Sequence, residues 1–174
     1  TYRHNYPALA DLRQQGATLY QCDFYQQTSV DELISCIQKD HPVLRCLIHN
    51  ASDWLPDSPS SDVPCAEVLL PWQVMDKMMT VHVNVPYQLN LAFQGLLSAC
   101  ADKSKDIIHI SDYVVDKGSK KHIAYAASKA ALANMTLSFA ARLAPEIKVN
   151  SIAPALMLFN ENDSQSYKNK ALFN

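Results

Sequence analysis

The chain has 174 residues, enough for one domain with a buried core and too few for two domains of ordinary size. Its 15 basic and 17 acidic residues, with 48% hydrophobic residues, exclude a disordered chain and argue against a nucleic acid as partner. The sequence contains neither a membrane-spanning run nor a leader pattern, so we expect a soluble, cytoplasmic protein that does not bind membranes.

The first part of the chain alternates helix and strand signals. A helix is predicted from Pro7 to Gly16, because proline favours a first helical turn and glycine a helix end. Residues 17–23 hold β-branched and aromatic side chains and predict a strand, and residues 43–49 predict another. Between them, apolar residues recur at the spacing of one helix face: Val30, Leu33, Ile34 and Ile37.

The middle of the chain combines a long loop with two helices. Residues 51–64 are rich in proline, serine and aspartate, which excludes regular structure, and long loops at strand ends are often binding loops. We therefore expect an active-site loop over residues 51–64. Helices are predicted over residues 66–82 and 86–100, with a break near Asn84, because Pro86 disfavours a helical residue before it.

The last part continues the alternation, with strands predicted over residues 106–111 and 147–152 around an Ala-rich helix over residues 123–143. The whole pattern predicts a single α/β domain over residues 1–174, a Rossmann-like, doubly wound parallel sheet with helices on both faces. Ligands bind such sheets beyond the carboxyl ends of the strands. The polar groups expected there are Asp23, Asn50, Ser52, Asp112 and the segment after Pro154.

The counts of two residue types limit the chemistry. The five cysteines are widely spaced and no histidine pair has metal-ligand spacing, so we expect reduced core thiols and no metal. Only three glycines are present, which indicates that this sequence holds no Gly-rich phosphate-binding loop.

Tyr125 and Lys129 are four residues apart on the predicted helix, so both side chains rise from the same face. An ammonium near a phenol stabilises the phenolate, and we expect Lys129 to lower the pKa of Tyr125 and make it a usable proton donor. The same spacing is also found in solvated surface pairs. Asp112, at the end of a strand, and Asn84, whose freed backbone carbonyl could hold a water, supply the context of a site.

A family resemblance is carried by four places in the chain: Ile123–Leu132, Val149–Pro154, His49–Ser52 and Asn84. They are similar to the active-site helix, the strand after it, the Asn-Asn-Ala-Gly motif and the helix-break Asn of the short-chain dehydrogenase/reductases. The resemblance implies a Rossmann-like oxidoreductase in which Tyr125, Lys129 and Asn84 are catalytic.

The chain departs from the usual family pattern at Asp112, which stands where the family's catalytic Ser precedes the Tyr. Together with Trp54, which follows Ser52 closely, it resembles the pteridine reductases, in which an aromatic ring and the nicotinamide sandwich the pterin. This implies reduction of a dihydropterin to a tetrahydropterin, with dihydrofolate as a poorer substrate, Trp54 stacking on it and Asp112 binding it or orienting the proton relay. The alternatives are a loop or core anchor for Trp54 and a helix cap or turn former for Asp112.

The resemblance also implies a cofactor site. Arg3 would pair with the adenosine 2'-phosphate, which favours NADPH over NADH, and Asp23 would contact the adenine; the alternatives are a solvated Arg3 and a turn-forming Asp23. Residues 155–174 would cover the substrate. The residues implied to line the rest of the cofactor are Asn50, Ser52, Tyr125, Lys129 and Pro154.

The family's Gly-rich turn, first βα unit and last strand are absent from this sequence, so we expect an incomplete domain. The strands at 17–23 and 43–49 would pair directly or leave open edges, and the isolated chain would bind NADPH weakly or not at all. Two other functions stay open: a carbonyl reductase of the same family, or a non-catalytic fragment or scaffold. We expect a homo-oligomer formed through the helices at 86–100 and 123–143.

Overall fold

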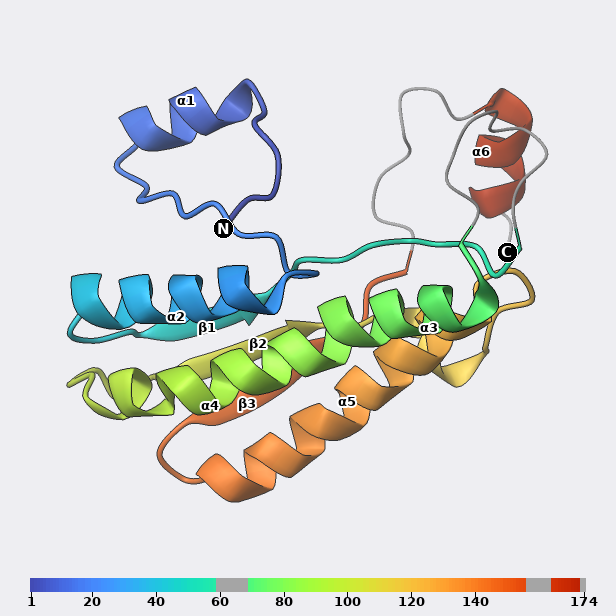
Figure 1. Cartoon of the computed structure of the whole chain (residues 1–174). Coiled ribbons are helices and arrows are strands. Elements are labelled where there is room, and N and C mark those ends of the chain that lie inside the picture. The colour runs from blue at the N-terminus through green and yellow to red at the C-terminus, as the bar shows by residue number, and fades with distance from the viewer. Residues whose placement is uncertain (59–68, 156–163, 173–174) are drawn as a thin grey trace.

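A three-stranded parallel sheet forms one layer of the molecule (Figure 1). The computed structural model describes residues 1–58, 69–155 and 164–172. The strands are β1 (Cys46–His49), β2 (Asp106–Ile110) and β3 (Lys148–Ile152), in the order β1-β2-β3. Cys46 pairs with Asp106, and Asp106 pairs with Lys148, so the carboxyl ends of all three strands meet at one edge. The predicted α/β class with a parallel sheet is confirmed.

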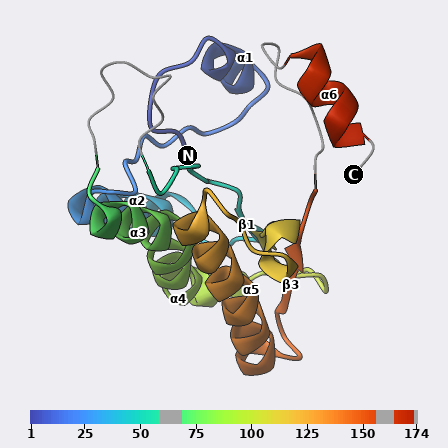
Figure 2. The same cartoon turned by 90° about the vertical axis from the view of Figure 1, so that its right-hand side faces the viewer.

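Three helices, α2 (Gln27–Asp40), α4 (Val85–Ser98) and α5 (Ile123–Leu143), lie on one side of the sheet (Figures 1 and 2). Crossovers between parallel strands are right-handed, so successive crossovers that step in one direction place their helices on the same face. Burial alternates accordingly: Ile107 and His109 of β2 are buried, whereas Ile48 of β1 is 58% exposed. Helices were predicted on both faces of the sheet; within the described residues these three helices cover one face.

The remaining elements connect this layer to the rest of the chain. They are α1 (Ala8–Gln14), α3 (Pro71–Met79), the π-helical turn η1 (Thr80–Asn84), the 3-10 helix η2 (Tyr113–Asp116) and α6 (Gln165–Leu172). As predicted, α1 ends next to Gly16, which has a φ of 90°. At Asn84 the structure has a wide π-helical turn rather than a break, since the Val85 amide still reaches the Thr80 carbonyl ahead of Pro86.

The predicted strand at 17–23 is wrong. The structure has only one isolated parallel bridge there, between Tyr2 and Gln21. The Tyr2 amide donates to the Tyr20 carbonyl at 3.0 Å and the Cys22 amide donates to the Tyr2 carbonyl at 2.9 Å. A strand needs a neighbour along its length, and within the described residues only the start of the chain lies beside this one. The segment does not pair with β1, so the second expectation, an open edge of the sheet, is the one observed.

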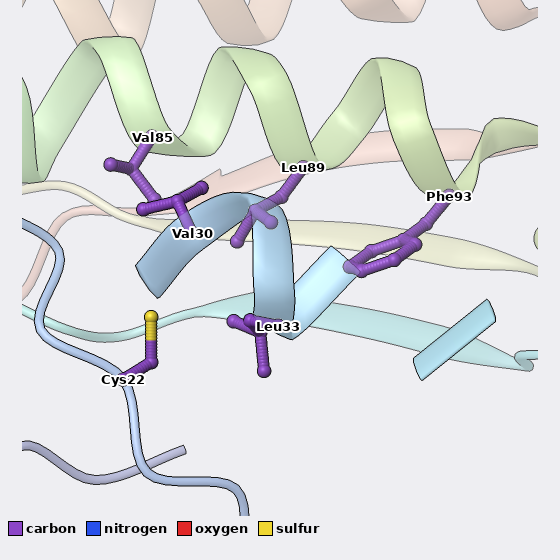
Figure 3. Close-up of a cluster of buried hydrophobic side chains, with 6 residues drawn as sticks. All are labelled: Cys22, Val30, Leu33, Val85, Leu89 and Phe93. Carbon is purple, nitrogen blue, oxygen red and sulfur yellow. The ribbon is translucent and has the colours of Figure 1, made fainter. Parts of the chain in front are cut away.

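The core consists of contacts between the helix layer and the sheet. One cluster joins α2 to α4 and is shown in Figure 3: Cys22, Val30, Leu33, Val85, Leu89 and Phe93. A second cluster joins the ends of α4 and α5 to β2 and β3: Leu97, Ile107, Phe139, Leu143, Ile147 and Val149. The second cluster holds the carboxyl-terminal half of α5 over the sheet. A third cluster packs the first turn of α5 against α3 and η1: Val74, Met78, Val81, Ala124 and Tyr125.

The cysteines are only partly as expected. Cys22, Cys36, Cys46 and Cys100 are free thiols, but only Cys22 is buried and Cys36 is exposed, so the prediction of core thiols is correct for one of them. Cys65 lies outside the described residues. In the described part of the chain no cluster of potential metal ligands is found, and no helix there has the length and apolar character needed to cross a membrane.

Candidate active site

Tyr125 and Asp112 form a direct hydrogen bond. Tyr125 rises from the first turn of α5, and Asp112 follows β2; the Tyr125 Oη donates to the Asp112 Oδ2 at 2.7 Å. The other carboxylate oxygen, Oδ1, accepts from the Val114 amide at 2.8 Å and caps η2. Asp112 therefore caps η2 with one carboxylate oxygen and accepts from Tyr125 with the other.

Lys129 lies one turn further along α5 and is only 3% exposed. Its Nζ donates to the Ile110 carbonyl at 2.9 Å and lies 5.6 Å from the centre of the Tyr125 ring. Burial lowers the pKa of Lys129 to about 8, with the nearby Asp112 charge acting in the opposite direction. The predicted common face of Tyr125 and Lys129 is present in the structure.

The pKa of Tyr125 is raised above its ordinary value, so the expectation that Lys129 lowers it is wrong. Burial is the largest cause, followed by the hydrogen bond to Asp112 and the charge of that carboxylate. The hydroxyl of Ser52 acts in the opposite direction. Because a carboxylate accepts the phenolic proton, deprotonation would place two negative charges side by side. Tyr125 is thus a protonated phenol near neutral pH, a state suited to an acid.

Trp54 lies beside this pair. Its ring centre is 4.7 Å from that of Tyr125 and 4.3 Å from that of His122, and the side chain is 58% exposed. The indole Nε1 donates to His122 Nε2 at 2.9 Å, and His122 Nδ1 lies 3.0 Å from the Leu55 carbonyl, to which it donates. Trp54 is anchored through its polar edge and still presents ring surface outward.

The loop that carries Trp54 is fixed to the start of α5. Asp57 accepts from the Ile123 amide at 2.6 Å and from the Ala124 amide at 3.1 Å, while its own amide donates to the Lys121 carbonyl at 3.0 Å. The carboxylate thus binds free amides at the positive end of the helix. Residues 59–64 of the predicted active-site loop lie outside the described residues.

A cavity of about 210 Å³ opens next to the loop. It is lined by Arg3, Tyr25, Ser52 and Asp53, among others. The Arg3 Nη1 lies 3.7 Å from the Asp53 Oδ2, and the same oxygen accepts from the Tyr25 hydroxyl at 2.9 Å. Burial, followed by the Asp53 charge, raises the pKa of Tyr25. The guanidinium of Arg3 is 43% exposed, so it is available to an anion entering from solvent.

A second cavity, of about 380 Å³, lies along the open edge of β1. It is mostly apolar, with His49 and Asn50 among its polar residues, and it shares Ala51 and Val81 with the first cavity. The two cavities therefore adjoin each other, and both are lined by Ala51, which follows the carboxyl end of β1, the edge at which ligands of parallel sheets bind.

Comparison with known proteins identifies the family. The family model for short chain dehydrogenases matches residues 3–170. The chain belongs to this family. It is 48% identical over 172 residues to a dihydromonapterin reductase of Klebsiella pneumoniae and 49% identical to that of Escherichia coli K12, covering 99% of this chain and 68% of each relative.

Solved structures agree with this family assignment. An alternative dihydrofolate reductase, FolM, of Brucella suis, in complex with NADP, superposes with a TM-score of 0.70 at 26% identity, over 92% of this chain and 61% of that one. FolM of Brucella canis, also with NADP, superposes with a TM-score of 0.71 at 27% identity, over 92% and 60%. The chain thus spans about 61% of the length of the Brucella suis protein.

Besides Arg3, four predicted site residues of this short-chain dehydrogenase lie away from the group formed by Tyr125, Asp112, Lys129 and Trp54. Asn84 is exposed on η1. The Asp23 Oδ1 accepts from the Tyr25 amide at 3.1 Å, as expected of a turn former, and Asp23 does not line either described cavity. The Pro154 carbonyl accepts from the Tyr113 amide at 3.2 Å, next to Asp112. Asn50 is exposed at the second cavity. In the predicted covering segment, residues 156–163 and 173–174 lie outside the described residues.

Sequence reasoning missed several polar residues that shape the site: Asp53, Asp57, His82, His122 and Ser128. One signal was available for His82, a polar residue between two valines in a helical, otherwise apolar run. For Asp57 and His122 no local signal exists, because each makes its contacts with residues far away in the sequence.

Proposed function

We propose that the protein carrying this chain reduces a dihydropterin to the tetrahydropterin with NADPH, and that dihydromonapterin is a better substrate than dihydrofolate. One observation carries this proposal: the protonated Tyr125 donates to Asp112 while the ring of Trp54 lies 4.7 Å away. An acid, a carboxylate and a flat apolar surface are the groups that a bicyclic amino-pyrimidine needs. The enzyme names of the relatives from Klebsiella and Brucella agree with it.

The reaction adds a hydride and a proton across a C=N bond, and NADPH, when bound, supplies the hydride. Tyr125 supplies the proton to the ring nitrogen, and the O–H bond breaks as the N–H bond forms. Asp112 orients the phenol before transfer and accepts from the amino-pyrimidine edge of the substrate. Lys129, 5.6 Å from the Tyr125 ring, stabilises the phenolate that results. A water near the exposed Asn84 would link Lys129 to solvent for reprotonation.

The residues present fit parts of the cofactor. The half-exposed guanidinium of Arg3 would exchange Asp53 for the adenosine 2'-phosphate, a stronger bidentate partner. Asn50 and Ser52, at the two adjoining cavities, would line the nicotinamide side. Pro154 and Asp23 line neither described cavity and would contact the nicotinamide and the adenine from outside them. No Gly-rich turn that could hold the pyrophosphate is present in this sequence, so weak NADPH binding by the isolated chain stays a prediction.

Subunit association is a second part of this proposal. Leu137 of α5 is 69% exposed and Tyr87 of α4 is 50% exposed. Apolar side chains on two helices of one layer are suited to a self-complementary contact. We propose a homo-oligomer formed through α4 and α5, and a cytoplasmic location.

The proposal is tested in a hybrid that joins this chain to the residues of the Klebsiella pneumoniae relative that lie outside the match. NADPH oxidation is measured with dihydromonapterin, dihydrofolate and a simple ketone. We expect the rate to fall in that order; a preference for the ketone would instead favour the carbonyl reductase, and no turnover with any of them the non-catalytic scaffold.

Tyr125→Phe should abolish turnover in the hybrid while leaving NADPH binding, followed by cofactor fluorescence, unchanged. Tyr20→Phe is the matched control, since Tyr20 also donates to a carboxylate, Asp40 at 2.9 Å, away from the site. A near-normal rate for Tyr125→Phe would refute the catalytic role.

A further inference from the structure

A buried histidine joins the binding loop to the active-site helix. His82 lies in η1 and is 1% exposed. Its Nε2 lies 2.8 Å from the Ser52 Oγ, and its Nδ1 lies 2.8 Å from the Ser128 Oγ of α5. The imidazole therefore connects three segments that are distant in the sequence, and its ring stands edge-on to that of Tyr125 at 5.4 Å.

The direction of these bonds follows from the proton count. The Ser128 hydroxyl donates its single proton to the Tyr125 carbonyl at 2.7 Å, so it accepts from His82 Nδ1. A neutral imidazole with its proton on Nδ1 has a bare Nε2, which accepts the Ser52 proton. Another acceptor near Ser52, the Asp53 carbonyl, is 3.5 Å away and offers a weaker bond.

The surroundings keep His82 neutral. Burial lowers its pKa to about 3, and the Lys129 charge acts in the same direction against the smaller opposite influence of Asp53. A charged imidazole carries a proton on both nitrogens and would need two acceptors. Here the Ser128 hydroxyl accepts from the ring, but the Ser52 hydroxyl donates to it.

We infer that His82 is a positioning residue of the active site: it accepts the hydrogen bond that the Ser52 hydroxyl donates, so that Ser52 acts toward the ligand as a hydrogen-bond acceptor. The inference rests on the proposed reductase function. The ligand group that Ser52 recognises is then an N–H donor, of the amide or amino-pyrimidine class. The wide turn of η1 is what places His82 between the loop and α5, and such turns are frequent at functional sites.

The bond direction is tested first, on the 174-residue chain itself. Long-range proton–nitrogen NMR of the ring nitrogens distinguishes the two neutral forms and the charged form. We expect a neutral His82 with its proton on Nδ1 at neutral pH; a proton on Nε2, or a charged ring, overturns the inference. His109, whose Nδ1 lies 2.7 Å from a threonine hydroxyl that itself donates to a carbonyl, provides an internal reference for the same form.

The positioning role is tested in the hybrid enzyme with two variants. His82→Phe fills the space without hydrogen bonds and should lower kcat/KM for dihydromonapterin about tenfold. His82→Gln, which can accept from Ser52 and donate to Ser128, should recover most of that loss. Unchanged activity of His82→Phe, or equal impairment of both variants, overturns the inference. If the parent hybrid is inactive but His82 carries its proton on Nδ1, only the reductase proposal is contradicted. If the parent hybrid is active but His82 is charged or carries its proton on Nε2, only the His82 inference is contradicted.

Discussion

The phenol of Tyr125 donates to the carboxylate of Asp112 at 2.7 Å, and burial followed by this contact raises the pKa of Tyr125, in contrast to the lowering expected from Lys129. The ammonium of Lys129 donates instead to the Ile110 carbonyl. The pKa of the acid in the proposed site is therefore set by burial together with a carboxylate from a strand end.

Replacing Asp112 should show how much its charge contributes to the pKa of Tyr125. Asp112→Asn removes the negative charge and keeps the shape, so the pKa of Tyr125 should fall toward its ordinary value, although burial still holds it above that value. Ultraviolet titration of tyrosinate formation measures the change, and the difference spectrum of Tyr125→Phe identifies the group. An unchanged titration curve in Asp112→Asn would show that the carboxylate has no such influence.

Removing the ring of Trp54 should weaken substrate binding. In the hybrid, Trp54→Ala should raise KM for dihydromonapterin about tenfold, because a stacking surface beside Tyr125 is lost. Trp54→Phe keeps an aromatic ring but loses the N–H that donates to His122, so its KM should lie between those of the parent and Trp54→Ala. The matched control is Trp72→Ala, since Trp72 is also an exposed tryptophan. Equal KM values for Trp54→Ala and the parent would exclude the stacking role.

Asp57 should stabilise the chain through the start of α5. Asp57→Ala leaves two amides of the first turn without their acceptor, and we expect a loss of about 1–2 kcal/mol in the free energy of unfolding, measured with urea. Asp76→Ala, near the carboxyl end of α3, is the control, because a negative charge there gains nothing from the helix dipole. A loss as large in the control would remove the capping explanation.

Lowering the pH should destabilise the fold through two buried histidines, His49 and His109, before the carboxylates become protonated. Burial is the largest cause that lowers the pKa of His49 to about 4 and that of His109 to about 4. Because their ordinary value is 6.5, the unfolded state binds more protons below that pH, so stability is complete above about pH 6.5 and declines toward pH 4.

The urea midpoint as a function of pH measures this decline. His49→Gln keeps a donor for the Asn90 Oδ1, which His49 Nε2 approaches to 2.8 Å, but cannot titrate, so its slope with pH should be smaller than that of the parent. Identical slopes for the two chains would contradict a neutral buried His49.

Local patterns predicted the parts of the structure that depend on local sequence. The helix predicted at 123–143 has those bounds in the structure, and it carries Tyr125 and Lys129 on one face, because an Ala-rich run without glycine or proline favours a helix whatever surrounds it. The strands at 106–111 and 147–152 are correct to within one residue at each end.

Features that depend on distant neighbours were not predictable in the same way. A strand exists only where another strand pairs with it, so residues 17–23 keep a single bridge at Gln21. The pKa of Tyr125 depends on which charge is nearest, and spacing along α5 reveals Lys129 but not the distance to Asp112. His82 likewise acquires its role only when Ser52 and Ser128 lie on either side of it.

The attachment of the binding loop to α5 has a consequence for recombination between related enzymes. Asp57 and Leu55 contact residues 121–124, so the loop and the beginning of the helix depend on each other and should be exchanged together. A crossover point placed between them would unite a loop from one parent with a helix start from the other, and chimeras that exchange both pieces together should tolerate the swap better.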